Sequence, residues 1–138
     1  YLATVWSIRA GGRTLRLRPG RPAPDGLAAL VVLTAYNPAS RPTPRAANRA
    51  ANRRLRALLH RRGIAWHPAR AHGTGPDARA WDEPGFALLG PRGGRAALRL
   101  ARALGQNAVL AAAPGAPARV VVTRPGFCGL PAGAVLGG

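Results

Sequence analysis

The chain contains no methionine and no lysine, and among its 138 residues it has one cysteine and four acidic side chains. The single Cys128 excludes an internal disulfide and agrees with a reducing compartment, so we expect a cytoplasmic protein. No apolar run approaches the roughly 20 residues that a membrane-spanning helix needs, and no secretory signal pattern is present. Because the chain starts at Tyr1 and lacks methionine, we expect it to be a trimmed segment.

The shortage of acids leaves a large positive charge. All 21 basic side chains are arginines, only Asp25, Asp77, Asp82 and Glu83 oppose them, and the net charge is +17. Such a charge attracts polyanions, of which nucleic acid is the obvious class. The simpler alternative is that the arginines only solvate the surface.

Apolar residues make up 47% of the chain, which is enough for one globular domain with its own core. Alternation of apolar and polar residues predicts a hairpin over 1–18, with its turn at Gly11-Gly12. A run that is apolar on both faces predicts a central strand over 27–36. Further strands are expected at 64–69, where Pro68 suggests an edge or an end, and at 86–89, 107–113 and 119–124.

Two helices are expected. The first should cover 44–62, with Thr43 as its N-cap, Pro44 at its first position and Gly63 as its stop. The second should begin at Pro91 and end before Gly105, with its first turn weakened by Gly93-Gly94. Residues 70–84 are predicted to form a long loop.

These elements give the order β-β-β-α-β-β-α-β-β. We predict an α+β fold, in which a mixed β-sheet carries two helices packed on one face. The domain should span 1–124, and the Gly- and Pro-rich residues 125–138 should form an irregular tail.

Side-chain amides stand where apolar residues are expected. Asn48 and Asn52 share one face of the first helix with Leu55 and Leu59, and Asn37 follows the central strand. An amide that faces a core is costly unless it is hydrogen-bonded. We therefore expect these amides either to pin the Tyr36-Asn37-Pro38 turn to the sheet or to form a small polar pocket.

The same segments resemble a family. Five motifs occur in order and at the family's spacing: Leu33-Thr34-Ala35-Tyr36-Asn37-Pro38, Asn48-Arg49, Asn52 with Leu55, Glu83-Pro84-Gly85-Phe86, and Gly105-Gln106-Asn107-Ala108-Val109. They are similar to a small bacterial family known as domain of unknown function 3293, over residues 1 to 124. The resemblance implies a small α+β domain without an established reaction. It adds Glu83 and Gln106 to the candidate polar pocket of Asn37, Asn48 and Asn52.

Glu83 can be interpreted in two ways. It could act as a general base, or it could hold Arg49 in an ion pair, and we favour the ion pair because structural pairs are commoner than catalytic ones. The spacing of His60, His67 and His72 matches no zinc pattern, so we expect neither a metal site nor a cofactor.

Arginine stripes on the two helices are the main evidence for a nucleic-acid partner. The candidate contacts are Arg45, Arg49, Arg53, Arg56, Arg92, Arg95, Arg99 and Arg102. Arginine suits phosphate through its bidentate fork. Because the seven aromatic residues are scattered along the chain, we expect contact with the RNA or DNA backbone rather than sequence-specific recognition of a single strand.

We therefore predict a non-enzymatic binding module that contacts a polyanion such as nucleic-acid backbone. One alternative is a small-ligand binder or enzyme that uses the Asn/Glu/Gln pocket. A second alternative is a structural or assembly protein. The sequence assigns no oligomeric state.

Overall fold

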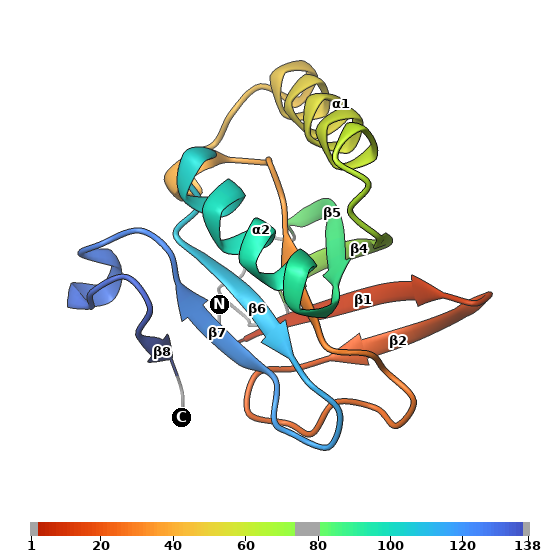
Figure 1. The fold of residues 1–138 in the computed structure, drawn as a ribbon. Helices are drawn as coiled ribbons and strands as arrows, with labels where there is room; N and C mark the ends of the chain where they lie inside the picture. The colour runs from red at the N-terminus through yellow and green to blue at the C-terminus, as the bar shows by residue number, and fades with distance from the viewer. Residues whose placement is uncertain (1–2, 74–80, 137–138) are drawn as a thin grey trace.

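One curled sheet forms the centre of the molecule (Figure 1). The computed structural model describes residues 3–73 and 81–136. Along the sheet the strand order is β2-β1-β4-β5-β3-β6-β7-β8. The strands are β1 (Thr4–Ala10), β2 (Arg13–Leu17), β3 (Leu30–Leu33), β4 (Trp66–Gly73), β5 (Asp82–Leu89), β6 (Ala108–Ala112), β7 (Arg119–Val122) and β8 (Val135–Leu136).

The central strand is β3, which lies between β5 and β6. All four of its residues are buried, as expected of a strand covered on both faces. It is shorter than the predicted 27–36, because the backbone of Ala35 and Tyr36 bonds to side chains rather than to a neighbouring strand.

Both helices, α1 (Arg45–Arg61) and α2 (Gly90–Ala103), pack on the same face of this sheet. Leu59 of α1 and Ala97 of α2 are fully buried in one cluster with Leu88 of β5. The α+β class and the two helices on one face are confirmed, and the predicted element order broadly matches. All neighbouring strands from β1 to β8 pair antiparallel, so the sheet is mostly antiparallel. Among the described residues, the one parallel bridge is an isolated pair of Pro19 and Ala118.

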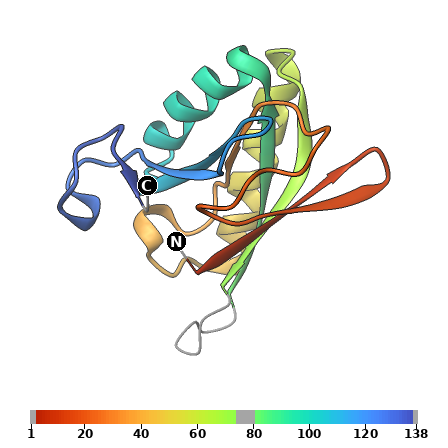
Figure 2. The same ribbon diagram turned by 90° about the horizontal axis from the view of Figure 1, so that it is seen from below.

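The other face of the sheet is covered by the chain that follows β2. Ala23 and Leu27 of this segment are buried against Trp6, Leu110 and Val120. Backbone hydrogen bonds from Gly20 N to Ala118 O (2.8 Å) and from Ala118 N to Arg21 O (2.9 Å) tie it to the start of β7. The sheet therefore curls, and the β1–β2 hairpin projects beyond the helices (Figure 2).

The predicted loop 70–84 is wrong at both ends. Strand β4 continues to Gly73 and β5 begins at Asp82, while residues 74–80 lie outside the described part. Of the two alternatives for Pro68, the edge is wrong, since β4 pairs with β1 and β5, whereas Pro68 does lie near the N-terminal end of the strand. Pro68 is tolerated there because the pairing with β1 begins only at the next residue, Ala69.

Both helices begin and end within one residue of the predicted bounds. Gly63 (φ 59°) and Gly105 (φ 67°) end the helices in the left-handed conformation that favours glycine. The predicted capping by Thr43 is wrong: its hydroxyl donates to Arg41 O, and Pro44 stands at the N-cap without a side-chain cap. No helix among the described residues is long and apolar enough to cross a membrane.

The segment after residue 124 was expected to be irregular. It contains a 3-10 turn, η2 (Phe127–Gly129), and the short strand β8, which pairs with β7 through Val121 and Val135. The prediction of an irregular tail therefore fails for β8, because the chain returns to the sheet edge. The division into a domain over 1–124 and a tail stays a prediction.

Candidate functional site

The loop between β3 and α1, residues 34–43, has an unusual backbone. Asn37 (φ 45°), Ala39 (φ 55°) and Ser40 (φ 57°) all adopt the left-handed conformation, and the short turn η1 (Pro38–Ser40) lies among them. Non-glycine residues adopt this conformation at a cost, so it persists only where the surroundings impose it. The amides predicted from the sequence are the groups that impose it.

Asn48 and Asn37 bond to each other twice. Asn37 N donates to Asn48 Oδ1 (2.9 Å), and Asn48 Nδ2 donates to Asn37 Oδ1 (2.8 Å) and to Thr43 O (3.2 Å). Thr43 N also donates to Asn37 Oδ1 (3.0 Å). Asn48 is buried on the inner face of α1, so its amide provides hydrogen-bond partners for polar groups of the loop that water does not reach.

Asn52, one turn further along α1, joins the loop to β5. Its Oδ1 accepts from Ala35 N (3.0 Å), and its Nδ2 donates to Pro84 O (2.8 Å). Thr34 Oγ1 donates to the same Pro84 carbonyl (2.8 Å) and accepts from Tyr36 N (3.0 Å). Two side chains thus replace the ladder hydrogen bonds that β3 gives up where it leaves the sheet.

Glu83 accepts a hydrogen bond from Asn37 Nδ2 at 2.8 Å. Burial raises the pKa of this carboxyl above its usual value; the bond from Asn37 opposes that shift, and the neighbouring Asp82 adds to it. The expected ion pair with Arg49 is wrong. The one ion pair among the described residues joins Arg70 to Asp82, because Glu83 is directed at the loop.

Gln106 holds the loop from the opposite side. Its Nε2 donates to Tyr36 O (2.9 Å), and its backbone carbonyl accepts from Thr123 Oγ1 (2.6 Å). Ala39 N also donates to Gly105 O (2.8 Å). The five predicted polar residues therefore come together around the 34–43 loop.

The side chains of this cluster hydrogen-bond to one another, to the loop and to its flanking strands. In the described part of the chain, no buried side-chain nitrogen or oxygen lacks a partner. Asn52 is the one of the five that lines the groove beside α1, and both of its amide atoms are already bonded. These contacts correspond to the pinned-turn alternative for the amides.

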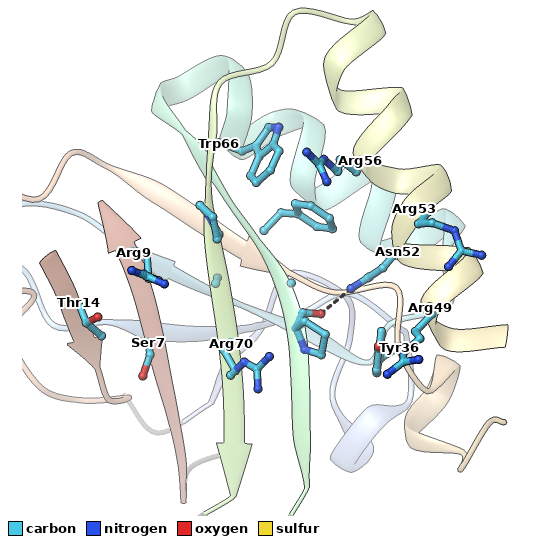
Figure 3. A pocket seen from close by; sticks show the side chains of 15 residues that line it. Ser7, Arg9, Thr14, Tyr36, Arg49, Asn52, Arg53, Arg56, Trp66 and Arg70 are labelled. Atoms are coloured by element: carbon cyan, nitrogen blue, oxygen red, sulfur yellow. Dashed lines mark hydrogen bonds between the residues drawn. The ribbon is translucent and has the colours of Figure 1, made fainter. Parts of the chain in front are cut away.

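Beside α1 the sheet carries a groove with a volume of about 740 Å³ (Figure 3). It exists because α1 and α2 cover the middle of the sheet and leave the neighbouring face of β1, β2 and β4 open. The lining residues are Ser7, Arg9, Thr14, Tyr36, Arg49, Asn52, Arg53, Arg56, Trp66, Pro68, Ala69, Arg70, Pro84, Gly85 and Phe86. We call this cavity the arginine groove.

Five arginines surround the arginine groove, three from α1 and one each from β1 and β4. They are Arg49, Arg53, Arg56, Arg9 and Arg70. Only Arg70 has a carboxylate partner, Asp82, among the described residues, and that pair is exposed. The positive charge of the groove is therefore largely uncompensated, which favours an anionic occupant.

Aromatic side chains lie among these arginines. The rings of Trp66 and Phe86 meet edge to face, with centroids 5.0 Å apart at 85°. The Arg56 guanidinium lies over the Trp66 ring, 5.9 Å from its centroid. Tyr36 lines the same groove from the 34–43 loop. The expectation that the aromatic residues are scattered is therefore wrong for these three.

The other predicted nucleic-acid contacts lie outside the groove. Arg45 and the four arginines of α2 are exposed, but none of them lines it. Arg92 Nη2 donates to Arg62 O (2.7 Å) and so caps the end of α1. Sequence reasoning missed Arg9 and Arg70, although their alternation with the buried Ile8, Ala69 and Ala71 was a usable signal.

The family model described as "Protein of unknown function (DUF3293)" matches residues 33–109, more than half of the chain. The chain belongs to this family. No curated protein and no solved structure matches it. The DUF3293 match contains the whole 34–43 loop, its amide network and the α1 wall of the groove, whereas Ser7, Arg9 and Thr14 of the far wall lie outside it.

Proposed function

We propose that this DUF3293 protein is a non-enzymatic binding module that contacts a polyanion, the backbone of a nucleic acid, through the arginine groove. The observation that carries the proposal is the convergence of five arginines on one concave surface, with a single carboxylate partner among residues 3–73 and 81–136. Arginine forks bind phosphate bidentately, and a concave surface of one charge concentrates the field at the ligand.

The amide cluster supports this proposal indirectly. Its hydrogen bonds hold the 34–43 loop and so fix the position of Tyr36 in the groove wall. Because these side chains bond to the loop and only Asn52 among them lines the groove, the geometry favours a binding module over a ligand pocket built from Asn37, Asn48, Asn52, Glu83 and Gln106.

The test is the affinity for labelled RNA and duplex DNA across a salt series. About five phosphate contacts give a slope of log affinity against log salt near −4 to −5 for a duplex and about −3 to −4 for a single strand. We expect Arg53→Ala to weaken binding and to reduce the magnitude of the slope by about 0.7 to 0.9, one contact's worth.

Arg99→Ala is the matched control, because it removes the same charge from an exposed position on α2 that does not line the groove. We expect a smaller loss than for Arg53→Ala. Equal losses would mean that binding is spread over the whole basic surface, and a flat salt dependence would refute polyanion contact altogether.

A further inference from the structure

The floor of the arginine groove has a chemistry that phosphate alone does not need. Trp66 and Tyr36 present partly exposed aromatic surface there, together with Pro68 and Pro84, while Phe86 is buried behind Trp66. A ligand that carried only phosphates would be met by the arginines and would leave these rings unused. The rings match a ligand that brings flat, apolar surface along with its negative charge.

Trp66 is placed to receive such a surface. Its ring is only partly buried and is braced by Phe86. The guanidinium over it is 5.9 Å from the ring centroid, farther than a stacked group would lie. A base that stacked on Trp66 would displace Arg56 outward, and Arg56, on an exposed flexible stem, could then meet a phosphate.

Tyr36 is held more firmly than a surface loop residue. Its N–H donates to Thr34 Oγ1 (3.0 Å), and its carbonyl accepts from Gln106 Nε2 (2.9 Å). The residue before it is bonded to Asn52 (3.0 Å). The amide network thus fixes the backbone of one groove-lining aromatic residue in advance, which lowers the entropic cost of ordering it on binding.

The size and aromatic floor of the groove fit a single strand better than a duplex. A volume of about 740 Å³ lies within the range of about 300–1,000 Å³ that encloses compact ligands, and suits one or two nucleotides. In a duplex the base faces are stacked inside the helix and cannot reach an aromatic floor. A single strand can turn its bases toward such a floor.

We infer that the arginine groove binds single-stranded nucleic acid, with a base stacked on Trp66 and the adjoining phosphates on Arg49, Arg53 and Arg9. This inference rests on the proposed function, since it assigns the class of polyanion. It replaces the expectation of backbone contact alone, which depended on scattered aromatic residues.

The experiment compares two single-stranded DNA decamers that carry equal numbers of phosphates, one with bases and one abasic throughout. Stacking contributes about 1–3 kcal/mol per base, so we expect the strand with bases to bind about fivefold tighter or more. The tryptophan fluorescence of the protein should be quenched by the strand with bases and not by the abasic strand. A duplex decamer should bind more weakly than the single strand with bases.

Trp66→Leu should remove the preference for the strand with bases, because only that strand has a base to stack at this position. Trp81→Leu is the matched control, because Trp81 is also partly buried but does not line the groove. Thermal unfolding checks that both variants fold. The wild-type comparison of the two strands tests the inference even if Trp66→Leu does not fold.

The outcomes separate this inference from the proposed function. If both strands bind equally with a steep salt dependence, polyanion binding stands and base stacking is refuted. If neither the two single strands nor the duplex binds, both proposals fail. If the duplex or a polyglutamate peptide binds as tightly as the strand with bases, the groove responds to charge alone and the assignment of a single strand is overturned.

Discussion

Replacing Asn48 by aspartate tests whether the amide network holds the 34–43 loop. The substitution keeps the oxygen that accepts from Asn37 N but converts the Nδ2 donor into a second carboxylate oxygen. That oxygen would face Asn37 Oδ1 and Thr43 O, where the native donor lies at 2.8 and 3.2 Å. The site is 5% exposed, so water cannot compensate.

The expected magnitude follows from the bonds lost. Asn48→Ala removes three hydrogen bonds, and at about 1 kcal/mol each this lowers the free energy of unfolding by about 3 kcal/mol. Asn48→Asp keeps one of them but adds a buried charge opposite two oxygens. We therefore expect it to be more destabilising than Asn48→Ala at pH 7, by about 4 kcal/mol or more in total.

The order of stability of the two variants should reverse in acid. Burial raises the pKa of the new carboxyl above its value of about 3.9 in the unfolded chain. The loss of stability caused by ionising this buried carboxyl is therefore absent below about pH 4 and grows as the pH rises toward the pKa of the folded state. When protonated, the carboxyl can donate one hydrogen bond, so Asn48→Asp should be the more stable of the two variants at pH 3.5.

The assay is urea unfolding followed by circular dichroism at pH 7 and pH 3.5. Ala47→Asp is the control, because it adds the same charge at an exposed position one residue earlier, where we expect a change within about 0.5 kcal/mol. An Asn48→Asp variant as stable as the wild type at pH 7 would show that this amide does not hold the loop.

Two further predictions concern stability, and urea unfolding measures both. Gly93→Ala should destabilise the protein by about 1–2 kcal/mol, because the added Cβ would lie 2.9 Å from the Leu88 carbonyl carbon. Gly94→Ala should stabilise it by about 0.5–1 kcal/mol, because the added Cβ would make only an ordinary contact at 3.5 Å. Equal effects at the two positions would contradict close packing of α2 on β5. Glu83→Gln keeps an oxygen that accepts from Asn37 and removes a carboxylate whose pKa is raised by burial. The urea midpoint of unfolding should therefore rise at pH 7. It should stay unchanged at pH 3, where Glu83 is protonated in both the folded and the unfolded state. A lower midpoint at pH 7 would show that the ionised carboxylate stabilises the fold.

Gly93 shows the limit of local propensity. From the sequence, Gly93-Gly94 only weakens the start of a helix. In the fold, the missing side chain at Gly93 allows α2 to approach the end of β5. A glycine required by close packing cannot be told from a glycine that merely costs helix stability until the opposite surface is known.

The amide cluster was predictable because its signal is periodic. Asn48 and Asn52 lie on the helix stripe of Leu55 and Leu59, and a polar group on a buried stripe must have a partner. The partner of Glu83 was not predictable, since Arg49 and Asn37 are both plausible by sequence and only the path of the loop selects Asn37.

The sequence by itself determined the elements whose information is local. Alternation defines the β1–β2 hairpin, a doubly apolar run defines β3, and glycines define where both helices end. It also determined the charge, which follows from composition alone.

Only the tertiary structure decided the arginine groove. Antiparallel pairing of β1 with β4 sets Ser7 opposite Arg70, and pairing of β4 with β5 sets Pro68 opposite Phe86. Each strand contributes alternate residues to the face beside α1, so one residue of slip in register would send them to the opposite face. Alternation within a strand indicates which residues share a face, but which strands pair depends on contacts between segments far apart in the chain.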